Sequence, residues 1–199
     1  MSTIVGPDGL RRCWWCGEDP LYFDYHDTEW GRPLRDERAL FELLCLEGFQ
    51  AGLSWITILR KRERFRQVFD GFDPERVSAY GEADVDRLMA DPGIVRNRAK
   101  VLATIGNARR FLELVSGGGS LADHVWSFAP PLGSEGHTGA RATSPASVSL
   151  SKDLKRRGWR FVGPTTVHAF LQAMGLVNEH DDGCWVRASC DEERRALGR

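Results

Sequence analysis

The sequence has no apolar run approaching the roughly 20 residues that a helix needs to span a bilayer. Its first 12 residues, MSTIVGPDGLRR, also lack the basic and then apolar organisation of a secretion signal. These absences argue against both a membrane protein and a secreted protein. We therefore expect a cytoplasmic protein that does not bind membranes.

The sequence also lacks the cysteine pattern of a disulfide scaffold. Its 5 cysteines are an odd number, and no secretion signal accompanies them. Reduced thiols, some of them free to bind a metal, fit this pattern better. The five are Cys13, Cys16, Cys45, Cys184 and Cys190.

There is almost no net charge, since the formal value is −1, so the whole chain gives no argument for a polyanionic partner. The basic residues are nevertheless grouped in three segments, 60–66, 94–112 and 152–160. Such a polarised surface suits a nucleic acid bound on one face. Solvated helix faces often have the same composition, so that alternative stays open.

Strand-like alternation is scarce, internal repeats are absent, and helical spacing of apolar residues dominates. With 199 residues, 42% of them hydrophobic and 28% charged, the chain fits one soluble all-α domain. We expect a flexible leader at 1–11, a single helical domain at 12–184 with a long loop at 129–147, and a loose tail at 185–199. The expected helices are one from the Asp36 cap to Gly48, one from about Ser54 to Phe69, one after Asp73-Pro74, a short one around 85–89, a long one up to Gly117, and three at 121–128, 149–157 and 164–174.

Cysteine and histidine residues near both ends of the chain have the spacing of a metal site. Cys13 and Cys16 precede His26, and His180 stands four residues before Cys184. Thiolates and imidazoles in tetrahedral number suit zinc, and four protein ligands leave no position for a reactive water. The alternative is two unrelated pairs. A metal held here would join the two ends of the chain.

A carboxylate and a cluster of aromatic residues indicate a binding pocket. Glu47 lies on an apolar helical run that we expect to break at Gly48, shortly before Trp55. An acid in this position, close to an indole, can form the floor of a pocket for a flat and cationic ligand. A solvated Glu at a frayed helix end is the competing interpretation. The aromatic cluster could form stacking walls around a nucleobase, or simply a core; its members are Trp14, Trp15, Tyr22, Phe23, Tyr25 and Trp30.

The segment Leu88-x4-Gly93-Ile94-Val95-x3-Ala99 is similar to a helix-hairpin-helix, whose glycine turn presents backbone N–H groups to a DNA phosphate. The second glycine of that pattern is Val95 here, so an ordinary helix–helix turn is the alternative. The residues that favour phosphate binding follow directly; they are Arg96, Arg98 and Lys100.

Together these segments resemble the DNA-3-methyladenine glycosylase I family of helix-hairpin-helix base-excision enzymes. The resemblance runs from Arg12 to about Cys184 and includes YHDTEWG at 25–31, LEGFQAGLSW at 46–55, LSKDLKRRG at 150–158 and GLVNEH at 175–180. It implies a monofunctional, monomeric enzyme that flips 3-methyladenine out of alkylated double-stranded DNA and hydrolyses its glycosidic bond, leaving an abasic site.

The resemblance also implies roles for individual residues. It assigns a structural Zn²⁺ to Cys13, His26, His180 and Cys184, with Cys16 open as a substitute for Cys13. It places the base among Trp15, Tyr22, Tyr25, Trp30, Glu47 and Trp55, with Glu47 as the catalytic carboxylate. It also implies a DNA wedge, which fills the gap left by the extruded nucleotide, at Gln50, Gly52 and Leu53.

Three alternatives remain. Asp123 follows a glycine run and mimics the catalytic aspartate of other helix-hairpin-helix enzymes, although the resemblance does not assign it that role. The chain could instead be a DNA-binding module without excision activity, or a zinc hydrolase with water on the metal.

Overall fold

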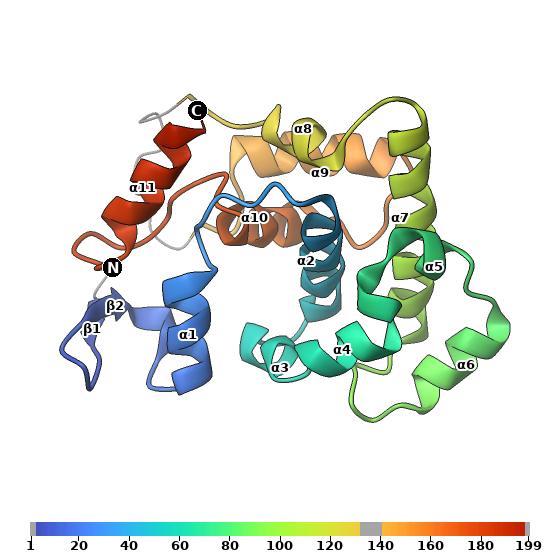
Figure 1. The fold of residues 1–199 in the computed structure, drawn as a ribbon, viewed down its shortest axis with the longest axis horizontal. Coiled ribbons are helices and arrows are strands. Elements are labelled where there is room, and N and C mark those ends of the chain that lie inside the picture. The colour runs from blue at the N-terminus through green and yellow to red at the C-terminus, as the bar shows by residue number, and fades with distance from the viewer. Residues whose placement is uncertain (1–2, 132–140, 198–199) are drawn as a thin grey trace.

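The computed structural model describes residues 3–131 and 141–197, which form a mostly helical protein as the sequence predicts. Figure 1 shows α2 in the middle, with α1, α11 and both chain ends on one side and α5, α6 and α7 on the other. Among the described residues, no helix is both long and apolar enough to cross a membrane. The elements are β1 (Thr3–Val5), β2 (Arg11–Cys13), the 3₁₀ turns η1 (Trp14–Cys16) and η2 (Asp70–Phe72), α1 (Pro20–Thr28), α2 (Glu37–Gln50), α3 (Trp55–Leu59), α4 (Arg62–Val68), α5 (Pro74–Ser78), α6 (Glu82–Ala90), α7 (Arg98–Ser116), α8 (Leu121–Trp126), α9 (Pro145–Arg156), α10 (Pro164–Ala173) and α11 (Arg187–Ala196).

Helix α2 is the core helix, and it begins where its sequence predicts. The Asp36 side chain accepts the Ala39 N–H at 2.8 Å and so satisfies a donor that a helix start leaves free. We expected this helix to end at Gly48, but it continues to Gln50. A Cβ at position 48 would lie 3.3 Å from the Cβ of Phe161, so this glycine lets another segment pack closely against α2. Glu47 therefore lies within the helix, in its last turns, and is buried there.

The predicted helices beyond α2 are present, with shifted ends. The expected helix from Ser54 to Phe69 is two helices, α3 and α4, separated by Arg60 and Lys61. Asp73 caps α5 with Pro74 in its first turn, as predicted. The expected loop at 129–147 ends at Ser144, because Ser144 and Ser147 form a capping box that starts α9 at Pro145. Part of this loop, 132–140, lies outside the described residues.

The described parts of the expected leader and tail contain secondary structure. Strand β1 pairs antiparallel with β2, with Thr3 opposite Cys13. Residues 187–196 form α11, which buries Cys190 and Arg194 and donates a 2.8 Å hydrogen bond from Arg194 Nη2 to the Leu176 carbonyl. The Trp185 N–H donates to the Arg11 carbonyl at 2.9 Å, so the two ends of the chain lie against each other.

Candidate active site and metal centre

A cavity of about 280 Å³ opens between η1, α1, α2 and α3 on one side and α10 with the following loop on the other. This volume is near the lower end for small-molecule pockets, which run from about 300 to 1,000 Å³. All six residues that the family resemblance assigned to a base pocket line it: Trp15, Tyr22, Tyr25, Trp30, Glu47 and Trp55.

The aromatic walls are held by contacts among themselves. The ring of Trp15 meets that of Trp30 at 5.0 Å and that of Tyr22 at 5.5 Å, both edge to face. Tyr25 and Trp55 lie 5.4 Å apart at a tilt of 45°. The Tyr22 hydroxyl accepts the Ile56 N–H at 2.9 Å and so fixes the first turn of α3 to α1. The rings therefore form a rigid, electron-rich wall.

Glu47 is only 3% exposed, which contradicts a solvated Glu at a frayed helix end. Its Oε2 atom has no hydrogen-bond partner among the described residues, and neither has the buried Nε1 of Trp55. Burial raises the pKa of Glu47 to about 8, because the charged form loses its hydration. Unpartnered buried polar atoms are costly, and two in one cavity indicate a ligand that hydrogen-bonds to them.

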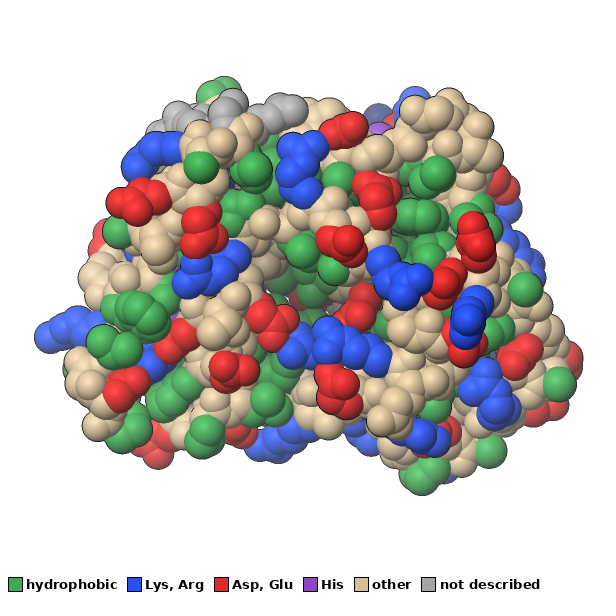
Figure 2. Space-filling model, viewed as in Figure 1, with side chains coloured by type: hydrophobic (Ala, Val, Ile, Leu, Met, Phe, Trp, Pro, Cys, Tyr) green, Lys and Arg blue, Asp and Glu red, His purple; other side chains and the backbone are tan. Residues whose placement is uncertain are grey.

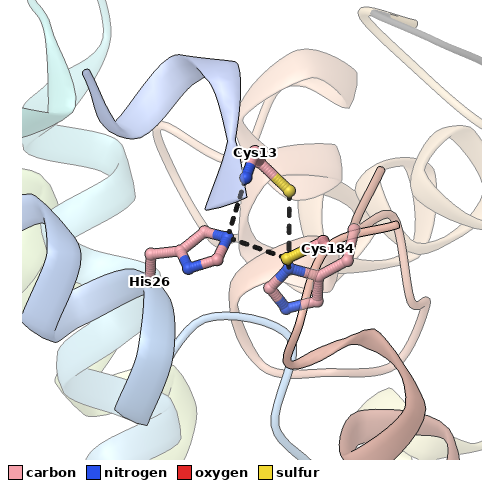
Figure 3. Close-up of side chains that lie close together, drawn as sticks. Cys13, His26 and Cys184 are labelled. Atoms are coloured by element: carbon pink, nitrogen blue, oxygen red, sulfur yellow. Dashed lines mark hydrogen bonds between the residues drawn. The ribbon is translucent and has the colours of Figure 1, made fainter. Parts of the chain in front are cut away.

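The four predicted zinc ligands come together. Their ligand atoms all lie within 4.8 Å of one another, and all four residues are buried. Figure 3 shows Cys13, His26 and Cys184 turned towards one another. The Cys184 Sγ lies 3.4 Å from His26 Nε2 and 3.5 Å from His180 Nδ1. Tetrahedral zinc with bonds of about 2.3 Å to sulfur and about 2.0 Å to nitrogen separates such atoms by about 3.5 Å, so the residues fit this ion.

Cys16 is not part of this cluster. Its Sγ is buried and donates to the Cys13 carbonyl at 2.9 Å. The structure therefore places Cys13, and not Cys16, among the candidate metal ligands.

Neighbouring groups orient the two histidines of the candidate metal site. The Nδ1 atom of His26 lies 2.7 Å from Asp27 Oδ1, and Nε2 of His180 lies 3.1 Å from the Trp30 carbonyl. Such outer contacts fix the ring that a histidine turns to a metal. A Cβ at Gly31 would lie 2.8 Å from His180 Nε2, so only glycine fits there. Trp30 lines the cavity as well, so the cysteine–histidine cluster supports one wall of the pocket.

The residues assigned to a DNA wedge lie at the pocket edge. Gln50 lines the cavity at the end of α2. Gly52 has a φ of +86°, which turns the chain, and the side chain of Leu53 is 43% exposed. An exposed leucine on a tight loop has the shape that a wedge requires.

The hairpin residues divide into two groups. Gly93 lies in the turn between α6 and α7, but its N–H donates to Asp91 Oδ1 at 2.7 Å. Arg96 is exposed and forms no ion pair with a described residue, whereas Arg98 pairs with Glu82 and Asp86. A phosphate bound at this turn would therefore have to displace carboxylates from Gly93 and Arg98.

Lys100 has another role than the predicted contact with DNA. It is 6% exposed, and its Nζ donates to the carbonyls of Phe49 at 2.7 Å and Ala51 at 2.6 Å. These carbonyls lie at the end of α2, where helices leave acceptors unsatisfied. We therefore withdraw Lys100 as a DNA ligand and assign it to the C-terminal cap of the helix that carries Glu47.

The basic segment 60–66 is largely neutralised by ion pairs. Figure 2 shows Lys and Arg interspersed with Asp and Glu over the face it displays. The pairs are Arg60–Asp19, Arg62–Glu29, Arg64–Asp91 and Arg66–Glu42. Segment 60–66 is therefore better explained as a solvated helix face than as a surface for nucleic acid.

Asp123, the alternative catalytic acid, is exposed on α8, pairs with Arg35 and does not line the cavity.

Sequence reasoning missed one wall of the pocket. This wall comes from α10 and the loop after it, and half-exposed Trp14 and exposed Arg141 also border the cavity. The motif GLVNEH contains one of the missed acids, but nothing local marks it as a pocket residue. The residues of this wall are Ala169, Gln172, Glu179 and Asp181.

The fold and the site define a helical protein with an aromatic, acid-floored pocket beside a closed cysteine–histidine centre. Comparison with known proteins gives its family. Residues 15–188 match methyladenine glycosylase, and the chain belongs to that family. It is therefore an enzyme of the glycosylase class.

Individual relatives cover nearly the same length. The chain is 50% identical to DNA-3-methyladenine glycosylase 1 of Escherichia coli over 88% of its own residues and 96% of the relative. It is 44% identical to the Haemophilus influenzae DNA-3-methyladenine glycosylase over 89% of this chain and 98% of that one. A crystal structure of 3-methyladenine DNA glycosylase I is 50% identical and superposes with a TM-score of 0.84, covering 87% of this chain and 98% of that one. A Staphylococcus aureus structure described as the basis of 3-methyladenine recognition is 40% identical with a TM-score of 0.82, covering 88% of this chain and 96% of that one.

Proposed function

We propose that this enzyme flips 3-methyladenine out of alkylated double-stranded DNA and hydrolyses its glycosidic bond, leaving an abasic site. The observation that carries the proposal is Glu47, a buried carboxyl in an aromatic cavity whose Oε2 finds no hydrogen-bond partner in the part of the chain that the structure describes. Relatives that are 50% and 44% identical are named as DNA-3-methyladenine glycosylases, which supports the same substrate here.

The chemistry suits a carboxylate rather than a strong general acid. Methylation at N3 makes the adenine cationic while it is attached to the sugar. The C1′–N9 bond then breaks with its electron pair moving to the purine, which leaves neutral, while water adds to C1′ and gives up a proton. Glu47 would accept hydrogen bonds from the base edge and stabilise positive charge as it moves towards the sugar. The described residues lining the cavity include no lysine, which favours water over an enzyme amine as nucleophile.

The raised pKa of Glu47 supports selection of a cation. With the pocket empty, burial favours the protonated carboxyl near neutral pH. A cationic ring beside it lowers this pKa again, since an opposite charge at short range favours the ionised form. A neutral base provides no such compensation. The aromatic faces of Trp15, Tyr25 and Trp55 add attraction for a cation.

DNA would be held by the pocket edge and the helical hairpin. We assign Gln50, Gly52 and Leu53 to the gap left by the extruded nucleotide, because Leu53 is exposed on a turn next to the pocket. We assign Arg96 to the phosphate backbone, together with Gly93 and Arg98, whose carboxylate partners the phosphate would displace.

We propose a structural zinc ion on Cys13, His26, His180 and Cys184. When bound, the ion supplies a cross-link between the two ends of the chain, and four buried protein ligands leave no coordination position for substrate. This arrangement favours a structural ion over a zinc hydrolase. The chain's own contribution is the orientation of His26 by Asp27 and of His180 by the Trp30 carbonyl.

The decisive experiment measures release of free 3-methyladenine from methylated duplex DNA by the purified wild-type protein. We expect release of 3-methyladenine, with strands that remain intact until the abasic sites are cleaved by alkali. Binding of the duplex without release of any base would instead support a DNA-binding module.

The two neighbouring cations Arg96 and Lys100 should behave differently when they are neutralised. We expect Arg96→Ala to weaken binding of undamaged duplex DNA and to lower the salt-dependence slope by about 1, with thermal stability unchanged. Lys100→Met should lower the melting temperature and leave the salt slope intact, because it removes a helix cap. Fluorescence titrations at several salt concentrations and thermal melts test both. A lower salt-dependence slope for Lys100→Met would instead show that Lys100 contacts DNA.

A further inference from the structure

The pocket wall formed by α10 and its following loop carries a second acid. Glu179 lines the cavity together with Gln172, and its side chain is 15% exposed. Glu47 lines the same cavity from α2, so acids from two separate elements face one space. No role for Glu179 follows from the sequence motif that contains it.

The Glu179 carboxylate is held in place but is not neutralised by a fixed cation. Gln172 Nε2 donates to Glu179 Oε2 at 2.6 Å, which orients the carboxylate. Among the described residues, no Lys or Arg forms an ion pair with it, although Arg141 lines the same cavity. The Nε2 atom of His168 lies 3.6 Å from its Oε1. Burial lowers the pKa of His168, because its charged form loses hydration in the interior. Neither an ion pair with a described Lys or Arg nor a charged His168 therefore competes with a ligand for the Glu179 carboxylate.

The hydrogen-bond capacity of this wall matches a cationic purine. Glu179 retains acceptor lone pairs on both oxygens, and the Gln172 amide keeps its carbonyl as an acceptor once its NH₂ group donates to Glu179. A ring that carries positive charge and amino donors satisfies such a wall, whereas a neutral ring leaves the carboxylate desolvated without compensation. Ala169 on the same wall is small, so it leaves room for the ring.

We propose that Glu179, oriented by Gln172, is a second recognition residue of the pocket and attracts the positive charge of N3-alkylated purines from a different wall than Glu47. This inference rests on the proposed function, because it takes the cavity as the base pocket. Glu47 and Glu179 then both contribute to the preference for cationic over neutral purines. Removing the charge of one of them should therefore reduce this preference without abolishing it.

The test compares two small probes in wild type and Glu179→Gln: the fixed cation 3,9-dimethyladeninium and the neutral 9-methyladenine. Glutamine keeps an acceptor for Gln172 but removes the charge. We expect Glu179→Gln to weaken binding of the cation by about tenfold, within the range an opposite charge a few ångströms away contributes, and to leave the neutral probe unaffected. Quenching of the pocket tryptophans reports both affinities.

The matched control is Asp182→Asn, which removes one charge from the same loop at a side chain that is 82% exposed and does not line the cavity. It should bind both probes like the wild type. Equal weakening of both probes by Glu179→Gln, or no weakening of either, overturns the proposal, and so does an equal effect of Asp182→Asn. Base release from methylated DNA separates the two ideas: if the wild type excises 3-methyladenine but Glu179→Gln excises it at the same rate, only the role of Glu179 is lost.

Discussion

Replacing Glu47 by glutamine should slow release of 3-methyladenine by about 10²–10³-fold, the loss typical of removing one preorganised charge-stabilising group. Zinc content and affinity for undamaged duplex DNA should stay close to those of the wild type. Glutamine has the shape of Glu47, so the cavity keeps its walls. The variant lacks the negative charge that attracts the cationic base and that stabilises the charge developing on the sugar. Single-turnover excision with enzyme in excess measures this step without product release.

Thermal stability of the same variant provides an internal control with a defined sign. The pKa of Glu47 rises from its ordinary 4.5 to about 8 in the folded protein. Stability linked to this group is full below the unfolded-state pKa and is lost as pH rises through the folded-state pKa. The wild type should therefore lose stability relative to Glu47→Gln between about pH 5 and pH 8, by on the order of 4 kcal/mol. Melting curves across this range check the prediction.

Two results would contradict the assignment of Glu47. Excision at the wild-type rate by Glu47→Gln would remove it from catalysis. If Asp123→Asn then lost activity, the reaction would have to use the acid on α8, although that side chain is exposed and paired with Arg35. A melting-temperature difference between wild type and Glu47→Gln that does not change with pH would show that the carboxyl is not desolvated in solution.

The sequence predicted those parts of the fold that depend on local signals. Asp36 and the Asp73-Pro74 pair start helices because their side chains accept nearby backbone N–H groups, which neighbouring residues decide. Gly48 was misread because its role is tertiary: the missing side chain admits Phe161, which is remote in sequence. Helix α11 was missed for a similar reason. Its segment is polar, and only packing of Cys190 and Arg194 against the rest of the protein stabilises it.

The site was predictable where chemistry restricts residue type. Cysteine and histidine at both ends, and an acid next to aromatic rings, have few other uses, and the structure brings those residues together. Lys100 shows the limit of this reasoning. In sequence it belongs to a basic segment, but its ammonium reaches two carbonyls about 50 positions away, at separations of 51 and 49 residues. Glu179 was missed because the contact that makes it a wall residue depends on how α10 packs against α2.

Replacing the proposed metal ligand Cys184 by serine should produce the largest loss of stability. Zinc held by the four residues would join His26 to Cys184 across 158 residues, and closing so long a loop removes much of the unfolded chain's entropy in simple models. We expect Cys184→Ser to lose stoichiometric zinc and to melt at least about 10 °C lower. Metal analysis and melting curves with and without a chelator measure both effects.

Cys16→Ser is the matched control, because its thiol is equally buried and lies three residues from Cys13 but contacts the Cys13 carbonyl rather than the cluster. It should retain zinc, whereas Cys13→Ser should lose it. Zinc loss by Cys16→Ser with retention by Cys13→Ser would mean that the second cysteine is the ligand in solution. Because Trp30 and Trp15 contact the metal-binding histidines and also line the pocket, the zinc-free variants should bind purine probes more weakly than Cys16→Ser. Affinity for the base and retention of zinc should therefore be lost together.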